Sequence, residues 1–263
     1  MPLYDAHCHL QDERLAPHLA AALARAAAAG VARLMCCGSS ESDWEDVVAL
    51  AGRHPAVRMS LGLHPWYVTD RTPAWLDRLR ELLARSSAAV GEIGLDHVLD
   101  KATHAAQEEV FLAQLAVARE LNRPVSVHCR QAWGRMQELL AAHGVPPAGM
   151  LIHSYSGSPE TIAWLQERGV YVSFSCSLTR SGNTRGHRSA AAARADRLLV
   201  ETDSPDIPPV PEPGVTPLLH DGRPLNEPAN LGRVARALAS VRETTEDEIA
   251  RLTWDNAVRL FGD

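Results

Sequence analysis

The sequence predicts an α/β protein whose core is a closed barrel of eight parallel strands, a TIM barrel. Two observations favour this fold class. Short apolar or β-branched segments recur about every 28 residues, and helix-like or loop segments separate them. Ionisable residues also stand where many of these segments end, which is expected when an active site lies at the carboxyl ends of barrel strands. A doubly wound open sheet remains an alternative, because a pattern of segments does not reveal closure.

The elements can be placed along the chain from apolar spacing and from Gly, Pro and capping residues at their ends. The expected strands are Leu3–Ala6, Ala32–Cys37, Val57–Leu61, Ala88–Val90, Pro124–Val127, Met150–Ile152, Val170–Ser173 and Leu198–Val200. The expected helices between them are Ala20–Ala29, Asp43–Arg53, Pro73–Arg85, Gln107–Leu121 and Pro159–Arg168. Extra C-terminal helices are expected at Ala229–Val241 and Thr245–Phe261, so one domain covers residues 1–263.

Composition excludes several classes of protein. The chain has 263 residues, of which 46% are hydrophobic, enough for a sizeable core. It has neither a signal peptide pattern nor a long apolar run, so we expect a soluble, cytoplasmic protein with no membrane partner. Five cysteines without a C-x-x-C pair indicate neither a disulfide framework nor a thiolate zinc site. A net charge of −6 argues against a surface that grips duplex DNA broadly, so any contact with a polyanion is local.

Eight ionisable residues stand in, at the end of or just after the expected strands. In "YDAHCHL", alternation predicts that Asp5, His7 and His9 share one face while Cys8 packs against helices. The others are His64 in "SLGLHP", Glu92 in "AVGEIGLDH", His128 in "PVSVHCR", His153 in "LIHSYSG" and Asp203 in "LLVETDSP". Each alone is explained by a backbone hydrogen bond or a helix cap. Together, four histidines and two carboxylates at strand ends favour a shared metal site.

The donor types indicate which metals the site takes. Nitrogen and oxygen ligands without thiolate suit Zn²⁺, Mn²⁺, Ni²⁺, Co²⁺ or Mg²⁺ in a hydrolytic centre. Six ligands are too many for one open tetrahedral ion, so two divalent cations that share a bridging carboxylate fit better. The chain's single lysine, Lys101, lies in the loop after Glu92 and cannot serve as a carboxylated bridge. Glu92 is therefore the natural bridging ligand.

Seven motifs together resemble the TatD family of metal-dependent hydrolases. They run in order through nearly the whole chain: "DAHCHL", "GLHP", "VGEIGLD", "PVSVHCR", "HSYSG", "ETDSP" and "NEPANL". The resemblance implies an amidohydrolase-like TIM barrel, a binuclear divalent-metal centre and deoxyribonuclease activity. It also implies that His7, His9, Glu92 and Asp203 bind one ion. Glu92, His128 and His153 then bind the other, and His64 is a substrate-binding or supporting histidine.

The chain departs from the family pattern in three places. "HSYSG" replaces the frequent "HCFSG", His97 follows Asp96 where an aromatic residue is common, and the segment 204–226 is longer than usual. The first two departures leave the ligands intact. The third concerns the substrate, because the seven prolines of Ser204–Leu225 stiffen a segment that we expect to roof the mouth of the site.

The expected function is hydrolysis of phosphodiesters, with single-stranded DNA or DNA ends as substrate. Asp203 is the expected general base, and Glu201 is the next candidate for that role. Arg130, Arg180 and Arg223 are candidates for phosphate contacts. One alternative is a metal-dependent amidohydrolase or lactonase acting on a small molecule, since a fold does not fix a function. Another alternative is a non-catalytic, metal-stabilised protein. The sequence does not fix the oligomeric state, and a monomer is possible.

Overall fold

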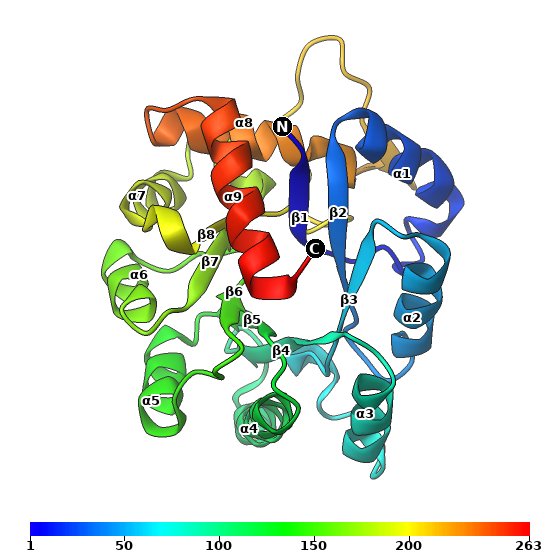
Figure 1. Cartoon of the computed structure of the whole chain (residues 1–263), viewed down its shortest axis with the longest axis vertical. Coiled ribbons are helices and arrows are strands. Elements are labelled where there is room, and N and C mark those ends of the chain that lie inside the picture. Colours follow the sequence, from blue (N-terminus) through cyan, green and yellow to red (C-terminus); the bar gives the residue numbers. More distant parts are fainter.

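Eight parallel strands form the centre of the structure, a computed structural model that describes all 263 residues. Each strand pairs with the next in the order β1 to β8. Their bounds are β1 Leu3–Cys8, β2 Val31–Cys37, β3 Val57–Leu61, β4 Ala89–Asp96, β5 Val125–Arg130, β6 Met150–Ile152, β7 Tyr171–Phe174 and β8 Leu198–Val200. Helices surround the ring of strands (Figure 1). The predicted TIM-barrel architecture is confirmed.

The segment that follows β8 closes the ring against β1. The backbone N–H of Asp203 donates to the carbonyl of His7 at 3.0 Å, and the N–H of His9 donates to the carbonyl of Ser204 at 2.7 Å. The buried carboxylate of Asp5 accepts the backbone N–H of Thr202 at 2.8 Å and its hydroxyl at 2.6 Å. Because both edges of the sheet meet here, the open-sheet alternative is wrong.

Nine α-helices accompany the strands. They are α1 Leu19–Ala28, α2 Trp44–Arg53, α3 Trp75–Ala84, α4 His104–Glu120, α5 Trp133–His143, α6 Pro159–Gln166, α7 Thr184–Ala192, α8 Leu231–Val241 and α9 Glu246–Phe261. The sequence did not reveal α5 and α7. A glycine and several polar residues interrupt the apolar spacing of α7, and α5 begins without a side-chain cap. Both helices are stabilised by packing in the ring rather than by strong local signals.

Strands β1, β4 and β5 extend beyond their predicted ends. Glu92 therefore lies within β4 rather than after it, and His128 lies within β5. The glycines of "GEIG" look like a strand end in the sequence, but here they allow close packing of two strands. A Cβ on Gly94 would lie 2.0 Å from the carbonyl oxygen of His128, so only glycine permits this register.

The prediction that Asp5 shares a face with His7 and His9 is wrong. Tyr4 and Ala6 belong to the apolar cluster inside the barrel, whereas Cys8 belongs to the larger cluster between strands and helices. Strict alternation would place Ala6 and Cys8 on the same side. The pairing of β1 with β2 shifts register between Asp5 and Cys8, and this irregularity turns His7 toward the site while Asp5 remains with Thr202.

Helix α9 fills the amino end of the barrel. Ala257 and Leu260 pack with interior residues of β1, β2, β6, β7 and β8, and the ring of Tyr4 contacts Trp254 and Phe261. The Asn256 side chain donates to the carbonyl of Leu198 where β8 begins. Figure 1 shows α9, in red, crossing in front of the strands. The opposite, carboxyl end of the barrel is left for the site.

The Pro-rich segment does not roof the barrel as predicted. Only its beginning, through Asp206 and Ile207, lines the cavity described below. Its later part pairs as a small antiparallel ribbon, β9 Leu218–His220 with β10 Arg223–Leu225, and the preceding loop projects away from the barrel (Figure 1). Glu212 of this segment forms an ion pair with Arg233 of α8, on the outside of the barrel.

None of the helices combines the length and the hydrophobicity that a membrane span requires.

Candidate metal centre

A cavity of about 1050 Å³ opens at the carboxyl ends of the strands. Loops that follow β1, β2, β3, β6, β7 and β8 contribute to its wall, together with Glu92 of β4 and the last residues of β5. The ionisable residues that line it include His9, His64, Glu92, His128, His153 and Asp203, all named by the sequence. Because parallel strands bring their carboxyl ends to one rim, His9 and Asp203 meet there although they are 194 positions apart in the chain.

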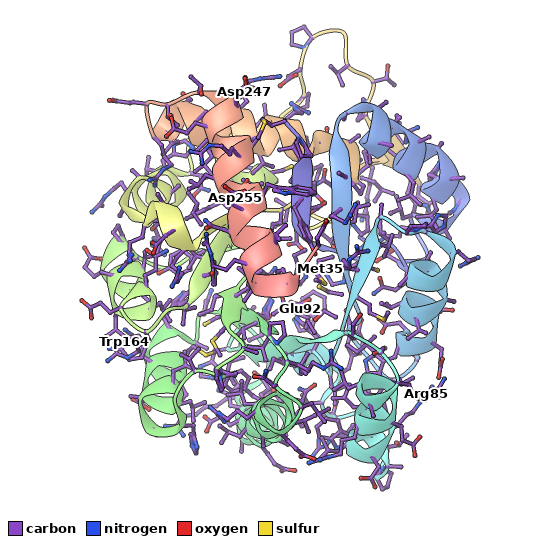
Figure 2. The ribbon with its side chains drawn as sticks, in the orientation of Figure 1. Met35, Arg85, Glu92, Trp164, Asp247 and Asp255 are labelled. Atoms are coloured by element: carbon purple, nitrogen blue, oxygen red, sulfur yellow. The ribbon has the colours of Figure 1, made fainter.

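Glu92 is the centre of this cluster, and its two carboxylate oxygens face different histidines. Oε2 lies 3.2 Å from Nε2 of His7 and 3.4 Å from Nε2 of His9. Oε1 lies 3.0 Å from Nδ1 of His128 and 2.8 Å from Nε2 of His153. Figure 2 places Glu92 near the barrel axis. One carboxylate thus divides four imidazoles into two pairs, the arrangement that a bridging ligand requires.

Glu92 is ionised in this setting. Burial opposes its charge, but the surrounding imidazoles of His64, His153 and His7 hold the pKa of Glu92 well below its usual range. A buried, ionised carboxylate needs positive charge beside it, which either protonated imidazoles or bound cations can supply. The electrostatics of the cluster therefore suit positive ions between Glu92 and its neighbours.

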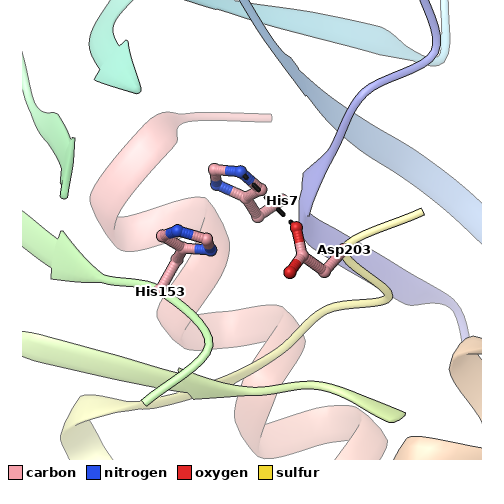
Figure 3. Close-up of side chains that lie close together, drawn as sticks. All are labelled: His7, His153 and Asp203. Carbon is pink, nitrogen blue, oxygen red and sulfur yellow. Dashed lines mark ion pairs between the residues drawn. The ribbon is translucent and has the colours of Figure 1, made fainter. Parts of the chain in front are cut away.

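Asp203 completes the cluster from the loop after β8. Its Oδ1 lies 4.0 Å from Nε2 of His7 and 3.8 Å from Nε2 of His9. His153 stacks on His7 with ring centroids 3.8 Å apart, and Figure 3 shows both rings beside the carboxylate of Asp203. Burial raises the pKa of Asp203 to about 6. The side chain is therefore poised to hold a proton or a cation.

Each of the four histidines paired around Glu92 has a second ring nitrogen that faces away from it, and the surroundings of these nitrogens fit metal-binding histidines. His9 Nδ1 donates to the carbonyl of Cys37 at 2.8 Å, and His7 Nδ1 lies 3.1 Å from the Ser126 hydroxyl. His128 Nε2 lies 3.3 Å from Asp96, and His153 Nδ1 lies 3.4 Å from Glu201. In His7, His9 and His128 a hydrogen-bond partner on one nitrogen leaves the other nitrogen aimed at the cluster, whereas Nδ1 of His153 lies near Glu201 without a hydrogen bond. A hydrogen-bonded second nitrogen is the usual arrangement around metal-binding histidines.

His64 differs from these four histidines. Its Nε2 lies 3.2 Å from Oε1 of Glu92, so it joins the cluster. Its Nδ1, however, accepts the backbone N–H of Trp66 at 3.1 Å. The neutral ring therefore carries its proton on Nε2 and presents a donor, not a lone pair, to the cavity. Burial lowers the pKa of His64 to about 4, which keeps the ring neutral.

The supporting roles of several residues were not identified from the sequence. Asp96, two residues beyond Gly94, holds His128, and the fallback candidate Glu201 accepts the backbone N–H of Ser154 and sits beside His153. Two buried glutamines of α4 clamp backbone at the ends of β3 and β4: Gln114 pairs with Leu63, and Gln107 pairs with Asp96. The spacing of seven residues between the glutamines was the available signal, since it places both on one helix face.

Arginines lie around the cavity unequally. Arg14 is neutralised by Asp12 and Asp206, whereas Arg130, Arg180 and Arg185 line the cavity without a carboxylate partner. Arg223, a predicted phosphate contact, lies exposed on β10 and does not line the cavity. Lys101 lies in a short exposed turn after β4, also outside it. All five cysteines are free and buried.

Comparison with known sequences gives the chain its family. A model of the family described as TatD related DNase matches residues 4–262. A protein of Bacillus subtilis (strain 168) named uncharacterized metal-dependent hydrolase YabD is 32% identical over 260 residues, which are 98% of both chains. A protein of Enterobacter lignolyticus named 3'-5' ssDNA/RNA exonuclease TatD is 31% identical over 271 residues, with 99% of both chains covered.

Solved structures agree with this comparison. YjjV, a TatD homologue from Escherichia coli K12, superimposes with a TM-score of 0.91 at 28% identity, covering 99% of this chain and 98% of the other. An uncharacterized amidohydrolase from Saccharomyces cerevisiae shares the fold, with a TM-score of 0.83 at 18% identity, covering 99% of this chain and 100% of the other. With its barrel, its strand-end cluster and a family match from residue 4 to residue 262, the chain belongs to the TatD-related DNase family.

Proposed function

We propose that this protein is a divalent-metal-dependent hydrolase of phosphodiester bonds, acting on single-stranded DNA or on DNA ends. The observation that carries the proposal is Glu92, whose two oxygens face separate histidine pairs at the floor of a cavity rimmed by uncompensated arginines. Relatives named as metal-dependent hydrolases and as a 3'-5' ssDNA/RNA exonuclease support it.

The proposed ligands divide around Glu92. His7, His9 and Asp203 with Glu92 hold one ion, and His128 and His153 with Glu92 hold the other. Two divalent cations supply Lewis acidity, which lowers the pKa of a water molecule and offsets negative charge on the phosphate. This chemistry is the same for Zn²⁺, Mn²⁺, Mg²⁺, Ni²⁺ and Co²⁺.

The chain's own residues provide proton transfer and orientation. Asp203 accepts the proton of the attacking water, because its carboxylate contacts only histidine rings and no backbone or hydroxyl donor. His64 carries its Nε2 proton beside Glu92, at 3.2 Å from Oε1, where the ring can also donate to a phosphate oxygen at the cluster. Water adds to phosphorus as the bond to one ester oxygen breaks, and the proton taken up by Asp203 passes to that leaving oxygen, so that a phosphomonoester and a free hydroxyl result.

Arginines around the cavity account for affinity toward phosphate groups, although the protein as a whole carries a negative charge. Arg130, Arg180 and Arg185 are exposed at the cavity and have no acidic partner, so their guanidinium groups are free to pair with phosphates. A chain of net charge −6 thereby gains a local positive rim. Because the metal cluster lies within the barrel mouth, flexible strands and ends reach it more readily than the interior of a duplex.

The test begins with metal-stripped protein, reconstituted separately with each candidate cation. Activity is measured on a single-stranded oligonucleotide, blunt duplex and closed circular duplex, and on panels of amides and lactones. We expect hydrolysis of the single strand, slower hydrolysis of blunt ends and none of the closed circle. Turnover of amides or lactones alone would establish the amidohydrolase alternative, and no turnover at measured full metal content would indicate a non-catalytic protein.

A further inference from the structure

Trp66 is a large aromatic side chain left open to the cavity. It lies in a short 3-10 turn, Pro65–Tyr67, directly after His64, and 52% of its surface is exposed. It is the chain's only exposed tryptophan, and its closest aromatic neighbour is His64, in an edge-to-face contact at 5.2 Å. No guanidinium group covers its ring, since the two cation–π contacts of the protein involve Trp164 and Tyr171.

The indole is nevertheless fixed in orientation. Its Nε1–H donates to Oδ2 of Asp96 at 2.8 Å, and the same oxygen lies 3.3 Å from Nε2 of His128. Oδ1 of Asp96 accepts the backbone N–H of Val98 at 2.9 Å. One carboxylate therefore holds both the edge of the indole and a ring of the metal cluster. An exposed tryptophan without such a partner would sample several rotamers.

The backbone on either side of this contact is also clamped. Gln114 receives the N–H of Leu63 at 2.7 Å and donates to its carbonyl, just before His64. Gln107 makes the same pair of bonds with the backbone of Asp96. Both glutamines are buried and lie on α4, which places the Trp66 turn and Asp96 on one support. A rigid side chain loses less conformational entropy when a ligand stacks on it, so this rigidity favours ligand binding.

We propose that Trp66 is the stacking platform for the nucleobase beside the phosphate at the metal cluster. This inference rests on the proposed function and adds one feature of the substrate, a flat base next to the scissile bond. His64 joins the two places: its ring contacts Trp66, and its Nε2 lies 3.2 Å from Glu92. Stacking accepts every base, so the platform confers a preference for nucleotides over other phosphodiesters without sequence selectivity.

The platform is tested by binding ligands that the enzyme cannot cleave as diesters. Isothermal titration calorimetry compares thymidine 5′-monophosphate with deoxyribose 5-phosphate on the metal-loaded protein. We expect the parent to bind the nucleotide roughly tenfold more tightly, which corresponds to one base stacked on an aromatic ring. Trp66→Leu should abolish this preference and Trp66→Phe should keep most of it. Trp164→Leu, which alters a tryptophan on the outer face of the ring of helices (Figure 2), should keep it fully.

A kinetic comparison separates this proposal from the proposed function. The parent and Trp66→Leu are assayed on a short single strand and on analogues that lack the base at the 3′ or the 5′ end. The preference for a terminal base, seen as a lower KM, should disappear in Trp66→Leu. If DNA is hydrolysed but the parent shows no base preference in either experiment, the platform is refuted and the nuclease stands. If the nucleotide preference depends on Trp66 but no DNA is hydrolysed, the platform stands and the nuclease is refuted.

Discussion

His64 Nδ1 accepts the backbone N–H of Trp66 at 3.1 Å, and this single bond separates His64 from the other histidines of the cluster. Since Nδ1 is occupied as an acceptor, Nε2 keeps its proton and cannot bind a metal ion. We therefore expect His64→Ala to retain the parental metal content, measured by elemental analysis, while its kcat falls at least tenfold. His153→Ala should instead lose metal. Equal metal loss in the two variants would make His64 a ligand.

Asp203 is expected to be essential for turnover but not for folding. Asp203→Asn should lower kcat by roughly 10²- to 10⁴-fold, the usual effect of removing a general base. The backbone of Asp203 has a positive φ of 59°, a conformation that asparagine tolerates as well as aspartate. The melting temperatures of metal-free parent and variant should therefore nearly coincide. Near-parental kcat at saturating metal would transfer the role of base to another residue.

Asp96 is expected to tune metal affinity through His128. Asp96→Asn replaces a carboxylate that accepts the ring N–H groups of both His128 and Trp66. We therefore expect the ion held by His128 to bind roughly 10- to 100-fold less tightly. Titration of chelated protein with Mn²⁺ measures this change. Asp77→Asn, on the exposed face of α3, is the matched control and should bind both ions like the parent. Parental affinity in Asp96→Asn would show that His128 needs no such partner.

The rim arginines are expected to act on phosphates, in contrast to Arg223. Arg180→Ala and Arg185→Ala should each weaken oligonucleotide binding and reduce the slope of log affinity against log salt by about one. Arg223→Ala should leave both quantities unchanged, because Arg223 does not line the cavity. Fluorescence anisotropy at several salt concentrations measures the slopes. If only Arg223→Ala weakened oligonucleotide binding, the Pro-rich segment would contact the substrate after all.

Leu260 is expected to stabilise the barrel without affecting the site. It is buried among the interior residues at the amino end, so Leu260→Ala should lower the free energy of unfolding by about 2–5 kcal/mol. Leu219→Ala, the same change on the exposed ribbon, should alter it by less than about 0.5 kcal/mol. Urea denaturation of metal-free protein provides both values. At saturating metal, kcat/KM of both variants should equal that of the parent.

The barrel was predictable from the sequence because its strands recur at regular spacing and end in polar residues. The six proposed ligands were named for the same reason, and the structure brings all of them around Glu92. What the sequence could not reveal depends on contacts between distant segments. The support of His128 by Asp96 follows from the register of β4 on β5, and this register depends on the close approach at Gly94. The path of the Pro-rich segment likewise depends on contacts with the 3-10 turn Cys176–Thr179 and with α8, such as the bond from the Val210 N–H to Thr179, which no local pattern indicates.

The side chains that fill the barrel, with α9 packed against its amino end, make the cavity a cul-de-sac. With Tyr4, Leu199 and Leu260 packed across the amino end, nothing that reaches Glu92 can continue through the barrel. If the proposed function holds, a polynucleotide must therefore retreat along the path by which it entered, and the released nucleotide leaves by the same mouth. Such an enzyme cannot thread its substrate past the catalytic groups as a ring-shaped nuclease does. We expect short trimming steps separated by dissociation, with intermediate lengths accumulating in a time course, rather than the uninterrupted digestion of one strand.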